Sequence, residues 1–156
     1  MMNESINSIQ SEMHLGDVID VIEEVLASGG EFRLFPKGVS MRPLILQGRD
    51  SVVLKRNEQA SAKKHDIAFY RRENGAFVLH RVMKVHKDGV FDMCGDNQFE
   101  IERGIKREQI IGYVSVIYRG DKQISVSSPF YKLYVFLWTK MPLRKIAVAI
   151  RGIFKK

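Results

Sequence analysis

The chain has 156 residues, of which 45% are hydrophobic and 28% are charged. This length fits one domain with a sizeable core, and the composition excludes a disordered chain or a membrane-spanning bundle. The single cysteine, Cys94, cannot form an internal disulfide and has no cysteine partner for a zinc site. We expect neither a metal nor a cofactor.

The net charge of +7 is distributed unevenly along the chain. Residues 1–31 carry seven acids and no Lys or Arg, whereas residues 128–156 carry seven bases and no acid. Such blocks are typical of interaction segments. The first 14 residues lack the pattern of a secretory signal, and no run of about 18 apolar residues could span a bilayer, so we expect a cytoplasmic protein.

Residues 1–30 are predicted to form an acidic leader and an amphipathic helix. From Leu15 to Ser28 the apolar side chains recur every three or four residues, with acids on the other face, and Gly29-Gly30 ends the pattern. The apolar face could pack on the domain or on a partner. Packing on the domain is the more frequent outcome for such a stripe.

Over residues 31–127 apolar and polar side chains alternate with a period of two, which predicts a mainly β domain. The expected strands cover residues 32–35, 51–55, 66–70, 76–85, 90–93, 110–118 and 123–126. Turn residues such as Glu73-Asn74-Gly75 and Lys87-Asp88-Gly89 separate them. Short strands with tight hairpins and no intervening helices predict an antiparallel sheet curled into a barrel-like form.

Residues 128–156 return to a helical pattern, with Pro129 opening one helix and Pro142 a second. One predicted face is apolar and aromatic: Phe130, Leu133, Tyr134, Leu137, Trp138, Ile146, Ala149, Ile150 and Ile153. The charged side chains of this tail are all Lys or Arg, which is typical of a helix lying in a membrane interface. The alternative is that the tail completes the core of the domain.

Three positions could together carry chemistry. Ser40, in "GVSMRP", is by itself an ordinary turn serine. His80 lies beside valines on one face of the strand "FVLHRVMKV", where an imidazole can stay neutral and act as a general base. Asp96 lies in the turn "CGDN", and Glu100 and Glu102 follow it; a histidine base is best oriented by such a carboxylate.

The motifs "GVSMRP", "SVVLK", "HDIAFYR", "FVLHRVMKV", "CGDN" and "IIGYV" occur in an order that resembles the signal peptidase superfamily of serine endopeptidases. The resemblance covers residues 32–119. A histidine before Arg-Val, as at His80, resembles the archaeal and endoplasmic-reticulum branch of that superfamily, whereas the bacterial branch has a lysine there.

The resemblance implies a Ser-His-acid site with Ser40 as nucleophile, His80 as general base, and Asp96 or Glu102 as the supporting carboxylate. Glu102 stands where that branch has an aspartate. Because Gly38 carries no hydroxyl, the oxyanion hole is expected from backbone N–H groups at Gly38 and Ser40. The extended peptide substrate is expected along an edge strand, near Phe35 and Met41.

The expected function is cleavage of a leader or signal segment from a peptide or protein by a serine endopeptidase. The alternative is a catalytically inactive module that binds a membrane surface on the same fold. Residues 128–156 are expected to contact the membrane, which would make the protein peripheral. No specific nucleic-acid binding is expected, because the helix ahead of Ser40 is acidic and would repel phosphates.

Overall fold

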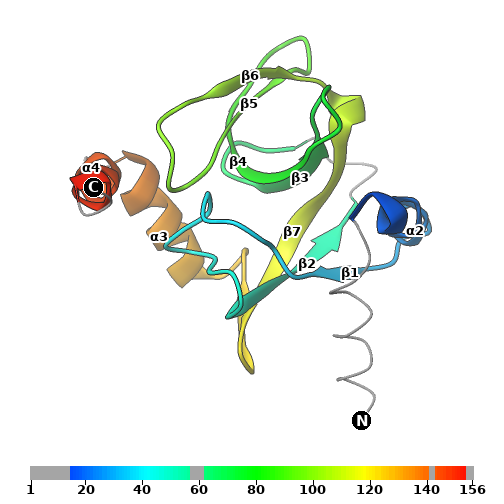
Figure 1. Ribbon diagram of the computed structural model, residues 1–156, viewed down its shortest axis with the longest axis horizontal. Coiled ribbons are helices and arrows are strands. Elements are labelled where there is room, and N and C mark those ends of the chain that lie inside the picture. The colour runs from blue at the N-terminus through cyan, green and yellow to red at the C-terminus, as the bar shows by residue number, and fades with distance from the viewer. Residues whose placement is uncertain (1–14, 57–61, 141–142, 154–156) are drawn as a thin grey trace.

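The computed structural model describes residues 15–56, 62–140 and 143–153 (Figure 1). In chain order the elements are α2 (Leu15–Ala27), β1 (Phe32–Leu34), β2 (Asp50–Lys55), β3 (Ile67–Arg71), β4 (Phe77–Val85), β5 (Phe91–Cys94), β6 (Glu102–Ile105), η1 (Arg107–Gln109), β7 (Ile110–Arg119), β8 (Lys122–Ser125), α3 (Pro129–Lys140) and α4 (Leu143–Ile153).

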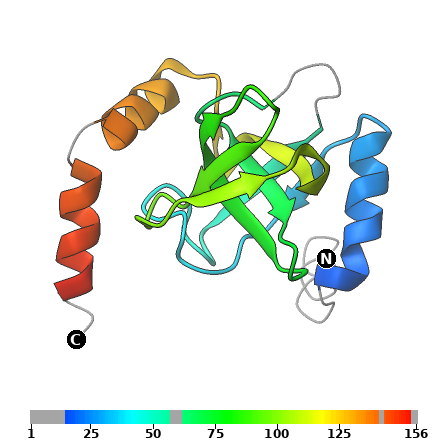
Figure 2. The ribbon, with the colours of Figure 1, turned by 90° about the horizontal axis from the view of Figure 1, so that it is seen from above.

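The described strands form one antiparallel sheet of eight strands in the order β1-β2-β7-β3-β4-β5-β6, with β8 beside β7. The sheet curls without closing. Helix α2 lies on one side of it, and α3 and α4 lie on the opposite side (Figures 1 and 2). This arrangement confirms the predicted fold class.

Two apolar cores occupy the two faces of the curled sheet. The larger core contains Ile19, Ile22 and Leu26 from α2 together with strand residues such as Val52 and Ile117. The apolar face of α2 is therefore packed on the domain, which confirms the interpretation favoured from the sequence.

The smaller core lies within the curl of β3 to β6. Its buried members are Ala62, Ala68, Tyr70, Val82, Phe91, Met93 and Ile105, and Val78 packs against them. Val78 and Val82 flank His80 along β4, so the alternation predicted for this strand places the imidazole at this core.

Two features differ from the sequence-based expectation. Strand β6 was not predicted, because "ERGI" has no apolar alternation and is defined only by its pairing with β5. The core contact of the first tail helix was also not predicted: Tyr131 and Val135, which lie outside the predicted apolar face, are the buried residues of α3, whereas Phe130 and Leu133 of that face are exposed.

Candidate functional site

Ser40 opens a turn that follows the edge strand β1. Gly38, two residues earlier, has φ of +94°, a left-handed conformation that a residue with a side chain adopts only with strain. Beyond Ser40, the buried side chains of Met41, Leu44 and Ile45 join the larger core. The turn is therefore anchored in the core on one side, while Ser40 itself stays half-buried.

The Gly95-Asp96-Asn97 turn packs directly on this serine. The backbone N–H of Asn97 donates to the carbonyl of Ser40 at 2.8 Å, and the Asn97 side-chain amide donates to the Val39 carbonyl at 3.2 Å. A Cβ at Gly95 would lie 2.6 Å from the Ser40 carbonyl oxygen and 3.1 Å from its Cβ. Only glycine at position 95 allows the two turns to approach this closely.

Ser40 and His80 line the same cavity, which has a volume of about 250 Å³. His80 reaches it from the middle of β4, and its side chain is buried, at 3% exposure. No described residue forms a hydrogen bond with the Ser40 hydroxyl, so the serine and the histidine face one cavity without being bonded. Catalytic hydrogen bonds are often loose or absent before substrate binds.

The environment of His80 favours the neutral imidazole. Burial, and next the positive charge of Arg72, lower the pKa of His80 to about 4. At neutral pH the ring therefore carries one proton, and one of its nitrogens has a free lone pair.

Hydrogen bonding decides which nitrogen is free. The Tyr70 hydroxyl donates its only proton to Oε2 of Glu102 at 2.8 Å, and it lies 3.2 Å from Nδ1 of His80. The hydroxyl can therefore only accept from His80, which assigns the ring proton to Nδ1 by proton count. Nε2 is left as the basic nitrogen.

Glu102 is held as a carboxylate beside this tyrosine. Burial favours its neutral form, but hydrogen bonds from the Arg72 guanidinium, at 2.7 Å to Oε2, and from Tyr70 together keep the pKa of Glu102 below its ordinary value. Glu102 thus reaches His80 through Tyr70 rather than directly.

Asp96, the other predicted acid, has a different partner. Its two carboxylate oxygens accept hydrogen bonds from Nε and Nη2 of Arg81, both at 2.7 Å, in an ion pair with 1% and 2% side-chain exposure. Arg81 is adjacent to His80 in β4, so its side chain projects to the opposite face of the strand. Of the two predicted acids, the structure brings Glu102 to the histidine and Asp96 to the arginine.

The residues predicted to form the oxyanion hole and to contact the substrate lie around the Ser40 cavity or next to it. The Gly38 N–H donates to the side-chain oxygen of Gln47 at 2.7 Å, so it is already engaged. Met41 is only 4% exposed but lines the Ser40 cavity. Phe35 is 45% exposed and borders a neighbouring apolar hollow, which shares Phe77 with that cavity.

The hollow at Phe35 lies beside an open sheet edge. In the described part of the chain β1 pairs only with β2, so the outer edge of β1 has free backbone groups that could pair with an extended peptide. Val18 and Ile22 of α2 also line this hollow, so the acidic helix lies beside the candidate site.

Sequence reasoning missed Tyr70, Arg72 and Gln47. Tyr70 is a strand residue of the smaller core, and only the register of β3 against β4, with Ala68 opposite His80, makes it a diagonal neighbour of the imidazole. Arg72 follows the end of β3, and its role depends on the unpredicted strand β6. No local signal distinguished these residues.

Comparison with models of known protein families gave no match, and comparison with curated proteins gave no significant match. Within the described residues, no group of three or more His, Cys, Asp or Glu side chains is arranged to hold a metal ion. None of the helices in the described ranges has the length and apolar character required to cross a bilayer.

Proposed function

We propose that the protein is a serine endopeptidase of the signal-peptidase type that cleaves a leader or signal segment from a peptide or protein. One observation carries this proposal: Ser40 shares a cavity with a buried, neutral histidine whose Nδ1 is engaged by Tyr70. A neutral imidazole with a free Nε2 is the form that a serine nucleophile requires as its general base.

In the proposed reaction, the substrate lies extended beside β1 and its scissile carbonyl enters the Ser40 cavity. Nε2 of His80 takes the hydroxyl proton as Ser40 Oγ bonds to the carbonyl carbon. The proton then passes to the leaving amine as the C–N bond breaks, and water hydrolyses the acyl-enzyme by the same route. The Ser40 N–H stabilises the oxyanion, and the Gly38 N–H joins it once Gln47 is displaced.

The supporting groups have separate roles in this proposal. Glu102 and Tyr70 hold the tautomer and orientation of His80. Asp96 acts as a positioning residue, because its ion pair with Arg81 fixes the turn whose Asn97 N–H bonds to Ser40. We place the activity in the cytoplasm, at the surface of a membrane.

A second candidate function is a catalytically inactive module on the same fold. The observation in its favour is that the Ser40 hydroxyl forms no hydrogen bond with His80 or with any other described residue. The two candidates differ in one measurable property, which is Ser40-dependent peptide cleavage.

The test is incubation of the purified protein with a peptide library from a digested proteome, followed by mass spectrometry of the new termini. We expect cleavage at a restricted set of sites and a loss of about 10³-fold or more in the Ser40→Ala variant. Ser28→Ala is the matched control, since among the described residues its hydroxyl bonds only to the Val25 carbonyl at the end of α2. Equal cleavage by Ser40→Ala would exclude the proposed nucleophile, and no cleavage by the wild type would favour the second candidate.

A further inference from the structure

Exposed apolar side chains concentrate on the two C-terminal helices. Seven of the thirteen large hydrophobic residues exposed in the described part of the chain belong to α3 and α4: Phe130, Leu133, Phe136, Leu137, Ile146, Ile150 and Ile153. Phe130 is 86% exposed and Ile153 is 71% exposed. Scattered apolar residues are ordinary on a protein surface, but a concentration of this kind marks an interaction site.

The inner face of α3 is already occupied, so this apolar surface has no remaining core to enter. Tyr131 and Val135 are buried in the larger core, and the Tyr131 hydroxyl accepts a hydrogen bond from Arg81 at 3.1 Å. Tyr134 and Trp138 donate to the side chain and to the carbonyl of Asp96. These contacts fix the rotation of α3 and direct its other side outwards.

The charged side chains of the two C-terminal helices are all positive. Residues 128–156 contain seven bases and no acid, and Lys132, Lys140 and Lys145 are exposed. The turn that faces α3 adds the exposed Lys63 and Lys64. Apolar and aromatic side chains among Lys and Arg are the features that bind a helix to an anionic lipid interface.

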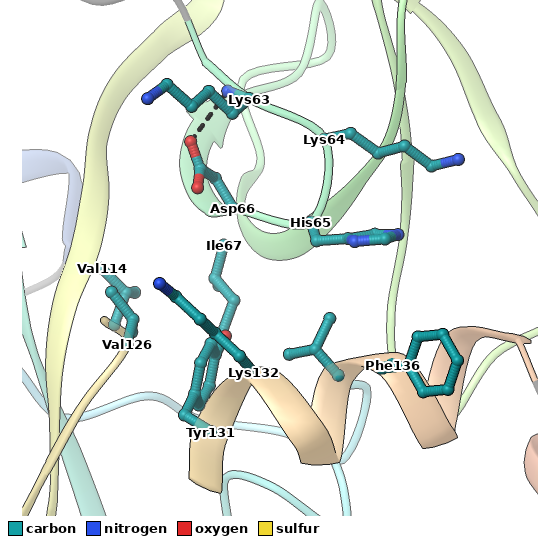
Figure 3. Close-up of a pocket in the computed structure, with 11 residues that line it drawn as sticks. Lys63, Lys64, His65, Asp66, Ile67, Val114, Val126, Tyr131, Lys132 and Phe136 are labelled. Carbon is teal, nitrogen blue, oxygen red and sulfur yellow. Dashed lines mark hydrogen bonds between the residues drawn. The ribbon is translucent and has the colours of Figure 1, made fainter. Parts of the chain in front are cut away.

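The cavity between that turn and α3 does not suit a small anion. In Figure 3 the side chains of Lys63 and Lys64 extend away from the cavity, while the Asp66 side chain lies at it. The Lys63 backbone N–H donates to the Asp66 carboxylate at 2.8 Å. Figure 3 also shows the Lys132 side chain reaching from α3 toward Asp66, so the cavity carries charges of both signs, while the outward Lys63 and Lys64 add positive charge beside α3.

A second copy of the chain is also a poor occupant. In a symmetric dimer the same surface meets itself, so the basic side chains of the two tails would face each other with no acid from residues 128–156 between them. Like charges placed close together oppose such a contact. Anionic phospholipid supplies both the apolar medium and the opposite charge.

We propose that α3 and α4, together with the Lys63-Lys64 turn, bind the surface of an anionic phospholipid bilayer. The bound surface lies two hydrogen bonds from the candidate nucleophile: Trp138 Nε1 donates to the Asp96 carbonyl at 3.1 Å, and the next residue, Asn97, donates to the Ser40 carbonyl. Lipid binding would therefore act on a helix that is linked to the Ser40 turn through the Asp96-Asn97 turn. This proposal concerns binding and does not depend on peptide cleavage.

The experiment is co-sedimentation of the full chain with vesicles of phosphatidylcholine alone and of phosphatidylcholine containing phosphatidylglycerol. We expect binding to the anionic vesicles, weakened by added salt because the attraction is partly electrostatic. The Ile146→Gln/Ile150→Gln double variant keeps the charge and a good helix former at each position, and we expect it to need about tenfold more lipid or higher for half-binding. Val21→Gln on α2 is the matched control, since Val21 is 51% exposed and α2 lies on the opposite side of the sheet from α3 and α4.

The fluorescence of Trp138, the single tryptophan of the chain, checks that α3 stays packed in each variant. The Lys63→Gln/Lys64→Gln variant is expected to lose affinity for the anionic vesicles only. The proposal is overturned if the wild type does not bind anionic vesicles, or if the isoleucine variant binds as the wild type does. It is also overturned if sedimentation velocity shows a dimer that the isoleucine variant dissociates while lipid binding is unchanged.

Discussion

Tyr70 connects a charged carboxylate to the imidazole of His80 while remaining neutral. Burial, and next its hydrogen bond to Glu102, raise the pKa of the Tyr70 hydroxyl above its ordinary value. The hydroxyl therefore keeps its proton at neutral pH, donates it to Glu102 and accepts from Nδ1 of His80. A carboxylate beside the ring would raise the pKa of the imidazole more strongly, because opposite charges attract. The intervening tyrosine orients the ring while allowing burial to keep it neutral.

Replacing Tyr70 by Phe tests this arrangement. The variant keeps the ring in the smaller core but removes the acceptor for the Nδ1 proton, so the imidazole loses its fixed tautomer. In the proposed enzyme we expect kcat/KM to fall by up to roughly 10²-fold, a part of what a positioned general base contributes. The measurement is the pH profile of kcat/KM on a peptide found in the library screen.

The pH profile distinguishes a loss of His80 orientation from disruption of the surrounding core. An imidazole acts as a base only above its pKa, so the acid limb of the wild type should lie near pH 4 rather than near the ordinary value of 6.5. Loss of an acceptor cannot make the charged ring more stable, so the limb of Tyr70→Phe should stay at or below that pH. A limb that rises toward 6.5 would mean that water has entered the core, and would contradict the orienting role.

At the level of the elements, the sequence predicts a strand where its own side chains alternate. The segment "FVLHRVMKV" is such a case, and the structure places β4 there. Strand β6 has no alternation, and Gly104 within it has φ of +80°, so only its pairing with β5 defines it. The helix α3 has apolar residues on all sides, and the position of the core decided which of them are buried. The ion pair of Asp96 with Arg81 likewise depends on tertiary contacts, including one from Tyr134 of α3. The sequence therefore could not decide whether Asp96 or Glu102 supports His80.

The turn that begins at Ser40 contacts the Gly95-Asp96-Asn97 turn. Adding one methyl group at Gly95 tests this contact. In Gly95→Ala the new Cβ meets the Ser40 carbonyl oxygen, a backbone atom that can move only if the nucleophile moves. We expect a destabilisation of roughly 1–3 kcal/mol by denaturant unfolding and loss of any Ser40-dependent cleavage. Gly16→Ala is the control, because its Cβ would meet nothing within 4 Å and alanine favours the helix α2. Wild-type activity in Gly95→Ala would show that the two turns are not held in this contact.

Over the whole molecule, Arg81 joins segments that are far apart in sequence. Its guanidinium binds Asp96 through two nitrogens, and its third nitrogen, Nη1, donates to the His65 carbonyl at 2.9 Å and to the Tyr131 hydroxyl. The turn before β3, the turn that contacts Ser40 and the helix α3 therefore share one buried cation. The proposed membrane helix and the candidate site are thus supported by the same group.

Because Arg81 joins these three segments, we expect Asp96→Asn to be the most destabilising carboxylate substitution among the described ion pairs. The variant leaves the Arg81 charge, at 1% side-chain exposure, without its anion, and breaking a buried pair from one side costs roughly 3–5 kcal/mol in the free energy of unfolding. Asp92→Asn is the matched control: Asp92 is also buried, but the side chains of its partners Arg103 and His86 are 70% and 33% exposed and return to water, so we expect about 1 kcal/mol or less. Urea unfolding followed by Trp138 fluorescence measures both. Equal losses in the two variants would contradict the role of Arg81, whereas recovery of stability in an Arg81→Met/Asp96→Leu double variant would support it, because the uncompensated charge is then gone.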